Sequence, residues 1–367
     1  MQFTDSLMAE ELFRLALEYD PAYSDAYVNL GWNYYFRYQN TVQYQPACLD
    51  SVRKYVDLAI ACDDQYDRAY ILRGYYHRML GEEDMAEVDY NRALELNPNS
   101  AGAYNGKAWM AWEKNDILEA IRNFHHAVNL DRGPSLSAGY YRLSQAYLLA
   151  GFKEQSVHYS EKALELSGDR PSYYLALANT EFWISKDLDK AQEYLHKGYA
   201  IDSTNVAILH AMGYFYLCAG AYDISLDYFK KYENQFDSPG NIPSYMKNHI
   251  ALSYLKNGYP GVAEEYFEQQ IDYLQNRLAL EKSSYDHHIL LAQIYALKRV
   301  KEKVYEHLKA FNQSEYTDIY TSRESLEHNL YFGEFLDDAE FNQLMSEIES
   351  KYEALHERVW RWLEEND

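Results

Sequence analysis

The sequence predicts an all-α solenoid of about eight helical hairpins, and three observations lead to this fold class. A pattern of small and large residues recurs about every 34 residues along most of the 367-residue chain. Its most regular copy, residues 67–100, has two helical segments separated by Gly81 and closed by Pro98. Small residues such as Gly74 and Ala86 let helices approach, while large residues such as Tyr90 fill the space between them. One hairpin cannot bury both of its faces, so the copies must stack on one another.

The first element, residues 1–23, has the pattern of a second helix from an incomplete repeat. Ala9, Phe13 and Ala16 match the second-helix signature of the repeat, and Pro21 follows the helix. No first helix precedes these residues in the sequence. We therefore expect an orphan helix with one apolar face uncovered, and further sequence upstream of it in the natural protein.

Residues 24–239 contain the main array of repeats. Its first hairpin carries an insertion of about nine residues near 37–51, which predicts either longer helices or a protruding loop. The later repeats begin at Asp67, Ala101, Ser137, Pro171 and Val206.

The turn-rich stretch FDSPGNIP ends this array and predicts a bend or flexible point. More divergent hairpins follow in residues 240–318, and the second helix of the first one continues through YLQNRLALEK. Residues 319–367 end in a long helix from about Ala339 to Glu365, a stretch with neither glycine nor proline.

The last helix has a heptad-like apolar seam, whose residues are Ile348, Tyr352, Leu355, Val359 and Trp362. Two interpretations of this seam stay open. It either caps the exposed face of the last repeat or joins two chains, or a chain and a partner, as an oligomer seam.

Composition excludes several function classes. The chain has 34 Lys and Arg against 57 Asp and Glu, a net charge of −23, so we expect no direct nucleic-acid binding and favour a neutral or basic protein partner. No run of about 18 apolar residues occurs, which argues against membrane insertion. Three cysteines without a CxxC pair indicate a reducing compartment, and we predict a soluble, cytoplasmic protein.

The segments LGWNYYF at Leu30–Phe36 and AEVDYNRALELNP at Ala86–Pro98 resemble the tetratricopeptide repeat superfamily, and the resemblance covers residues 9–313. It implies a right-handed superhelix of antiparallel helix pairs that binds partner segments in its concave groove. The stretch LFRLALEYDPAYSDAYVNLGW and the C-terminal tail look like the repeat modules of multidomain bacterial regulators. In those regulators the repeats follow a DNA-binding or nucleotide-cyclase domain, and neither domain is present here.

The candidate binding site is the groove-facing stripe of the first helices, which collects aromatic side chains with amides between them. Its residues are Trp32, Tyr35, Tyr75, Asn105, Trp109, Trp112, Tyr141, Gln145, Asn179, Trp183, His210 and Tyr214. Flat rings supply contact area, and amides can pair with the backbone of an extended peptide. The alternative is that neighbouring first helices pack these rings against one another and fill the groove.

No catalytic, cofactor or metal site is predicted. The histidine pairs at 125–126 and 287–288 are adjacent in sequence, so their side chains point about 100° apart on a helix. No glycine-rich phosphate loop or GxSxG motif occurs. We predict a non-catalytic scaffold that binds protein or peptide, as the sensory or assembly module of a bacterial regulatory protein. The alternatives are a homo-oligomerisation module, using the C-terminal helix or the open N-terminal face, and small-ligand binding in the aromatic groove.

Overall fold

The computed structural model describes residues 2–40, 46–279, 286–314, 316–321 and 330–366. All regular secondary structure in these ranges is helical, as predicted. The α-helices are α1 Gln2–Tyr19, α2 Ser24–Asn40, α3 Pro46–Cys62, α4 Asp67–Leu80, α5 Glu83–Leu96, α6 Ala101–Glu113, α7 Ile117–Leu130, α8 Leu136–Leu149, α9 Lys153–Ser167, α10 Pro171–Trp183, α11 Leu188–Ile201, α12 Val206–Cys218, α13 Tyr222–Glu233, α14 Ser244–Lys256, α15 Pro260–Ala279, α16 Asp286–Leu297, α17 Lys301–Gln313 and α19 Ala339–Asn366. The 3-10 helices are η1 Pro239–Asn241, η2 Ile319–Thr321 and η3 Gly333–Phe335. None of the described helices combines the length and the apolar composition that a membrane-spanning segment requires.

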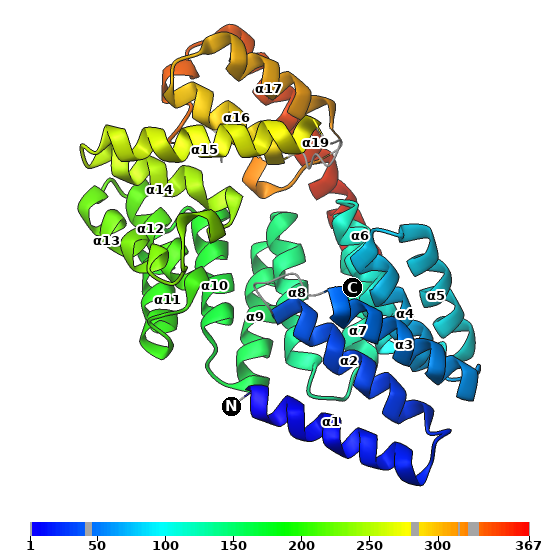
Figure 1. Ribbon diagram of the computed structural model, residues 1–367. Coiled ribbons are helices and arrows are strands. Elements are labelled where there is room, and N and C mark those ends of the chain that lie inside the picture. The colour runs from blue at the N-terminus through cyan, green and yellow to red at the C-terminus, as the bar shows by residue number, and fades with distance from the viewer. Residues whose placement is uncertain (1, 41–45, 280–285, 315, 322–329, 367) are drawn as a thin grey trace. The chain divides into compact units, whose positions relative to one another are not determined.

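The chain forms two compact units, residues 1–139 and residues 140–367. In the first unit, α2 pairs with α3, α4 with α5 and α6 with α7, and the first helices α2, α4 and α6 pack side by side (Figure 1). In the second unit the pairs are α10 with α11, α12 with α13, α14 with α15 and α16 with α17. The α-solenoid of helical hairpins predicted from the repeats is therefore confirmed.

The insertion in the first hairpin lengthens its helices. Both α2 and α3 have 17 residues, against 14 in each of α4 and α5. The part of the predicted insertion at residues 41–45 lies outside the described residues. Later in the chain, α15 runs for 20 residues and includes the predicted continuation as far as Ala279, whereas residues 280–282 of that prediction lie outside the described residues. The 3-10 helix η1 lies in the turn-rich stretch before α14.

The turn inside most hairpins depends on a residue in the left-handed backbone region. After α4, Gly81 has φ 75°, and the backbone N–H groups of Gly81 and Glu82 donate to the carbonyls of Arg78 and His77. Glycine reaches this region without the clash that a Cβ atom causes, so it ends the helix at little cost. The same role falls to Gly151, Gly220 and Gly258, and in other hairpins to Asn115, Lys186 and Arg299.

The packing of unit 1 confirms the expected alternation of small and large residues. Tyr90 on α5 is fully buried, and its ring lies against the backbone of Gly74 on α4 and of Gly106 on α6. Ala86 and Ala93 on α5 are also fully buried. Two glycines thus make the space for one ring, which joins a hairpin to the next one in the stack.

Helix α19 packs on several parts of unit 2. Its first half packs on α17, where Lys309 pairs with Glu340 at 2.7 Å. In its second half, the ring of His356 stacks on Phe152 with centroids 4.3 Å apart, and His356 Nδ1 lies 2.8 Å from the carbonyl oxygen of Ala150. Helix α19 therefore covers the last repeat and also reaches the turn between α8 and α9.

Candidate functional site

The inner surface of unit 1 is formed by the first helices α2, α4 and α6, and it begins with a cluster of aromatic rings. The ring of Trp32 lies edge to face with Tyr35 at 5.3 Å and with Tyr75 at 5.1 Å, and it stacks on Phe36 at 5.7 Å. Tyr75 in turn receives a hydrogen bond at its hydroxyl oxygen from Nδ2 of Asn105, at 2.5 Å. Side chains from three successive repeats thus form one continuous surface, because the groove-facing positions recur with the repeat.

Arg78 occupies the centre of this surface. Its guanidinium lies 5.4 Å from the ring centroid of Tyr75 and 5.9 Å from that of Trp109, and it forms an ion pair with Glu113 at the end of α6. The Nη2 atom of Arg78 donates to the hydroxyl oxygen of Tyr35 at 3.2 Å. Only 11% of the Arg78 side chain is exposed, against 48% for Glu113. Burial raises the pKa of Glu113, and the charge and hydrogen bond of Arg78 oppose that rise.

Two buried polar atoms lie at the base of this surface. Nε of Arg78 has no hydrogen-bond partner among the described residues, whereas the hydroxyl of Tyr90 interacts with the Arg78 side chain. A buried polar group without a partner costs free energy, unless water or a ligand group satisfies it. The base of this surface is therefore a place where a polar group from outside the chain would be stabilised.

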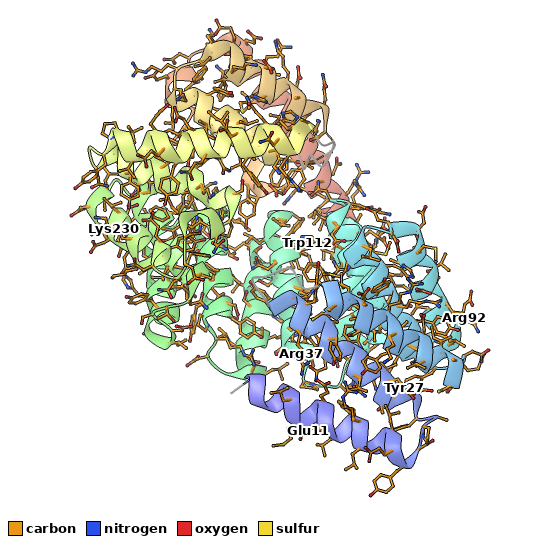
Figure 2. All side chains as sticks on the ribbon, viewed as in Figure 1. Glu11, Tyr27, Arg37, Arg92, Trp112 and Lys230 are labelled. Carbon is orange, nitrogen blue, oxygen red and sulfur yellow. The ribbon has the colours of Figure 1, made fainter. Side chains whose placement is uncertain are left out.

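The predicted residues of unit 1 differ in how much of each a ligand could reach. Tyr35 and Tyr75 are only 2% and 7% exposed, so they mainly pack between α2, α4 and α5. Trp32, Asn105, Trp109 and Trp112 are half-buried, and Trp112 is labelled on α6 in Figure 2. Phe36, next to Trp32, is 52% exposed. The accessible part of the surface therefore consists of parts of three indole rings, the amide of Asn105 and the phenyl ring of Phe36, and the buried tyrosines support them.

The remaining predicted residues lie on the inner surface of unit 2, and all of them are half-buried: Tyr141, Gln145, Asn179, Trp183, His210 and Tyr214. The structure brings three of these together with one histidine of the next hairpin. Trp183 stacks on Tyr214 at 6.0 Å, Tyr214 lies 4.4 Å from the ring of His249, and Nε2 of His210 lies 3.0 Å from Nδ1 of His249. Tyr141 instead lies against Tyr173 at 5.4 Å.

The chain's own C-terminal segment lies on this second surface. The ring of Tyr320, in η2, forms a T-shaped contact with the ring of Trp183, with centroids 5.0 Å apart. Farther along, Tyr331 lies 6.2 Å from the ring of His249 and is 4% exposed. The inner surface of unit 2 is thus covered in part by residues 316–321 and 330–335 of the same chain.

The histidine pair on this surface is uncharged at neutral pH. Burial lowers the pKa of His210 to about 4, and burial and then the charge of His210 lower the pKa of His249. Burial also raises the pKa of the nearby Cys218 thiol to about 12, so this thiol is not a thiolate at neutral pH. Among the described residues, no cluster of three or more His, Cys, Asp or Glu side chains could hold a metal ion.

The predicted seam of the last helix lies mostly inside the chain. Ile348, Leu355 and Val359 are 1%, 4% and 0% exposed, whereas Tyr352 and Trp362 are half-buried. Ile348 belongs to the hydrophobic core of unit 2 together with Val304 and Phe341, and Leu355 and Val359 are buried as well. Whether this helix caps the last repeat or joins two chains stays a prediction.

Sequence reasoning did not select two residues of these surfaces. Arg78 lies on the groove-facing stripe of its repeat, but the selection considered aromatic rings and amides only. Tyr320 belongs to no repeat, and no local pattern connects it with Trp183.

Comparison with known proteins agrees with this geometry. Residues 67–100 and 137–170 each match a family model described as tetratricopeptide repeat. The chain is similar to the human Protein SGT1 homolog, with 33% identity over 86 residues, which are 23% of this chain and 22% of that protein. It is also similar to human Tetratricopeptide repeat protein 6, with 23% identity over 203 residues, which are 55% of this chain and 37% of that protein. The chain thus matches well under half the length of these two relatives.

Among solved structures, the chain resembles one from the APC/C hetero-tetramer Cut9-Hcn1. The match covers 92% of this chain and 57% of that chain, with a TM-score of 0.52 and 17% identity. At this identity, the likeness concerns the fold alone.

Proposed function

Because the chain belongs to the tetratricopeptide repeat superfamily, whose members are generally non-catalytic scaffolds for protein interactions, we propose that the inner surface of unit 1 binds a peptide segment of a protein partner. The observation that supports this proposal is the continuous surface around Arg78, which combines aromatic rings from three repeats with a buried cation. Rings of this kind give a large contact area at small entropic cost, and they are frequent at the energetic centre of interfaces. The arginine supplies a directional polar contact between them.

The role of this binding is proposed more narrowly as that of a sensory or assembly module in a bacterial regulatory protein. Its support is the likeness of the N-terminal stretch and of the tail to the repeat modules of such regulators. The structurally similar Cut9 is itself part of a hetero-tetramer with Hcn1, which is an assembly role on the same kind of fold. The net charge of −23 favours a partner that is neutral or basic outside the segment that meets Arg78.

The experiment uses a display library of random peptides and selects binders on the wild-type chain. Each selected peptide is then titrated by fluorescence anisotropy against Trp109→Ala and Trp32→Ala. We expect each substitution to weaken binding at least tenfold, because it removes an indole from the surface. The matched control is Trp360→Ala, since Trp360 on α19 is 48% exposed and lies outside the inner surface. Peptides that bind all four proteins equally would show that the binding surface lies elsewhere.

Tyr75 is unsuitable for this test, although it belongs to the predicted stripe. Its ring is buried between Trp32, Tyr35 and Tyr90. Truncation to alanine would leave a cavity and cost about 3–5 kcal/mol of stability, so that lost binding would report on folding. The half-buried tryptophans avoid this ambiguity.

A second candidate function is self-association through α1. Its exposed side presents an apolar stripe at spacings of four, three and four, whose residues Met8, Leu12, Leu15 and Tyr19 are 63%, 59%, 46% and 84% exposed. Figure 2 labels Glu11 on this outer part of the helix. Light scattering across a dilution series tests this candidate. A dimer that Leu12→Glu converts to a monomer would support it, whereas a monomer at all concentrations would reject it.

A further inference from the structure

We infer that the inner surface of unit 2 is a second docking site, whose ligand is a short segment carrying a tyrosine, and that residues 316–321 occupy it in this chain. A partner segment of the same chemistry would bind where Tyr320 now lies. This inference is independent of the surface around Arg78, because it concerns other helices and other residues.

The first observation is the position of the occupant. The rings of Tyr320 and Trp183 lie with their centroids 5.0 Å apart and an interplanar angle of 77°. This is a T-shaped arrangement, in which the positive edge of one ring meets the negative face of the other. Trp183 belongs to the stripe that we predict to face the groove, so the chain's own tyrosine lies where we expect a ligand.

The second observation is that the receiving surface is held in place from below. Trp183 contacts Phe182 at 4.8 Å and stacks on Tyr214 at 6.0 Å, while Phe182 stacks on the buried Phe215 at 4.2 Å. These contacts restrict the rotamers of the indole. A preorganised face loses little entropy on binding, which is the property expected of a docking site.

The third observation concerns the form of the occupant. Residues 316–318 belong to no helix, and residues 319–321 form the short η2. Thr317, Asp318 and Ile319 are 8%, 1% and 5% exposed, so this short segment is buried almost throughout. The hydroxyl of Tyr316 donates to Oδ2 of Asp318 at 2.5 Å, which stabilises the bend that presents Tyr320.

The segment is tethered at its start. The ammonium group of Lys351, on α19, donates to the carbonyl oxygen of Ser314 at 2.8 Å and to that of Asn312. A tethered segment acts at an effective concentration on the order of 1 mM, so a free copy of it competes poorly. Because the tethered segment competes for the site, the wild type would bind a weak ligand poorly. A variant without Tyr320 would bind the same ligand more tightly.

The test uses the 367-residue chain and a labelled, blocked hexapeptide with the sequence of residues 316–321, YTDIYT. Anisotropy is measured with the wild type, with Tyr320→Ala and with Tyr320→Phe. We expect Tyr320→Ala to bind the peptide at least tenfold more tightly than the wild type, because its site is vacant. Tyr320→Phe keeps the ring edge on Trp183 and should behave as the wild type.

Two controls connect the binding to this site. Trp183→Ala combined with Tyr320→Ala should lose the gain, and a peptide with alanine in place of the Tyr320 equivalent should not bind. Circular dichroism verifies that each variant is folded, and Tyr320→Leu, which keeps an apolar side chain without a ring, replaces Tyr320→Ala if that variant unfolds. Any one of three results would overturn the inference. The wild type and Tyr320→Ala could bind the peptide equally, Trp183→Ala could leave the binding of Tyr320→Ala unchanged, or no variant could bind the peptide.

Discussion

The ring of Tyr90 lies as a wedge between Gly74 and Gly106, and this packing leads to a quantitative prediction for the substitution Gly106→Ala. A Cβ atom on Gly74 would lie 2.5 Å from Cε1 of Tyr90, and a Cβ atom on Gly106 would lie closer still to the same ring. The ring is fully buried, and it cannot retreat from α6 without moving into α4. An added methyl group must therefore displace a helix or force the ring off its rotamer.

Two effects of opposite sign decide the magnitude. Alanine is favoured over glycine inside a helix by about 1 kcal/mol. Overpacking a closed core costs about 1–3 kcal/mol, and the closed position of this ring places the cost near the upper end of that range. We expect a net loss of about 1–2 kcal/mol in the free energy of unfolding, so the steric effect outweighs the helix propensity.

Urea unfolding followed by far-UV circular dichroism measures this loss. The matched control is Gly261→Ala in α15, where an added Cβ atom meets nothing within 4 Å, and we expect no loss there. In a Tyr90→Leu background the ring is absent, so Gly106→Ala should become neutral or favourable. A Gly106→Ala protein as stable as the wild type would refute the wedge, and so would an equal loss in the Tyr90→Leu background.

Three other substitutions or conditions test the fold. Burial keeps His210 neutral, with a pKa of about 4 in the folded chain against 6.5 in the unfolded chain. The free energy of unfolding should therefore have its full value above pH 6.5. It should fall by about 3 kcal/mol as the pH drops towards 4, because the unfolded chain then binds a proton that the folded chain does not. His210→Gln should flatten this dependence in urea titrations at several pH values, and an unchanged slope would contradict the assignment. Gly81→Ala should cost about 1 kcal/mol through its left-handed φ alone, and Gly81→Asn should cost less; equal melting temperatures for all three proteins would disprove the role of this turn. Ala86→Leu should lower the free energy of unfolding by about 1–3 kcal/mol through overpacking. Met85→Leu, at the exposed neighbouring position, should leave it unchanged, and a thermal melt compares the two variants.

Much of the fold could be predicted because its determinants are local. The alternation of Gly74, Ala86 and Tyr90 encodes the helix crossings of one hairpin, and Gly81 encodes its turn. The uninterrupted stretch after Ala339 predicted α19 to within a residue at each end, since no glycine or proline breaks it. Lys186 takes the same left-handed conformation as Gly81, yet its residue type gives no signal for it, because only the packed hairpin forces the backbone there.

The candidate site was predictable in outline only. The repeat stripe identified the aromatic rings, but burial divided them into the supporting Tyr35 and Tyr75 and the reachable Trp32 and Trp109. Arg78 lies on the same stripe, and its importance arises from the rings and the carboxylate that other repeats place around it. Such an environment is a property of three hairpins together, so the sequence of one repeat does not contain it.

By itself, the sequence determined the hairpins, their turns and the stripe of rings, because helix periodicity and small-residue spacing act over a few turns of one helix or between neighbouring helices. Only the tertiary structure decided that Tyr320 lies on Trp183 and that His356 lies on Phe152. The two partners in each of these contacts are more than a hundred residues apart, and no repeat relates them. Their pairing depends on how the whole of unit 2 curves and where its last helix ends. That geometry accumulates from every hairpin in the stack, which is why no local pattern reports it.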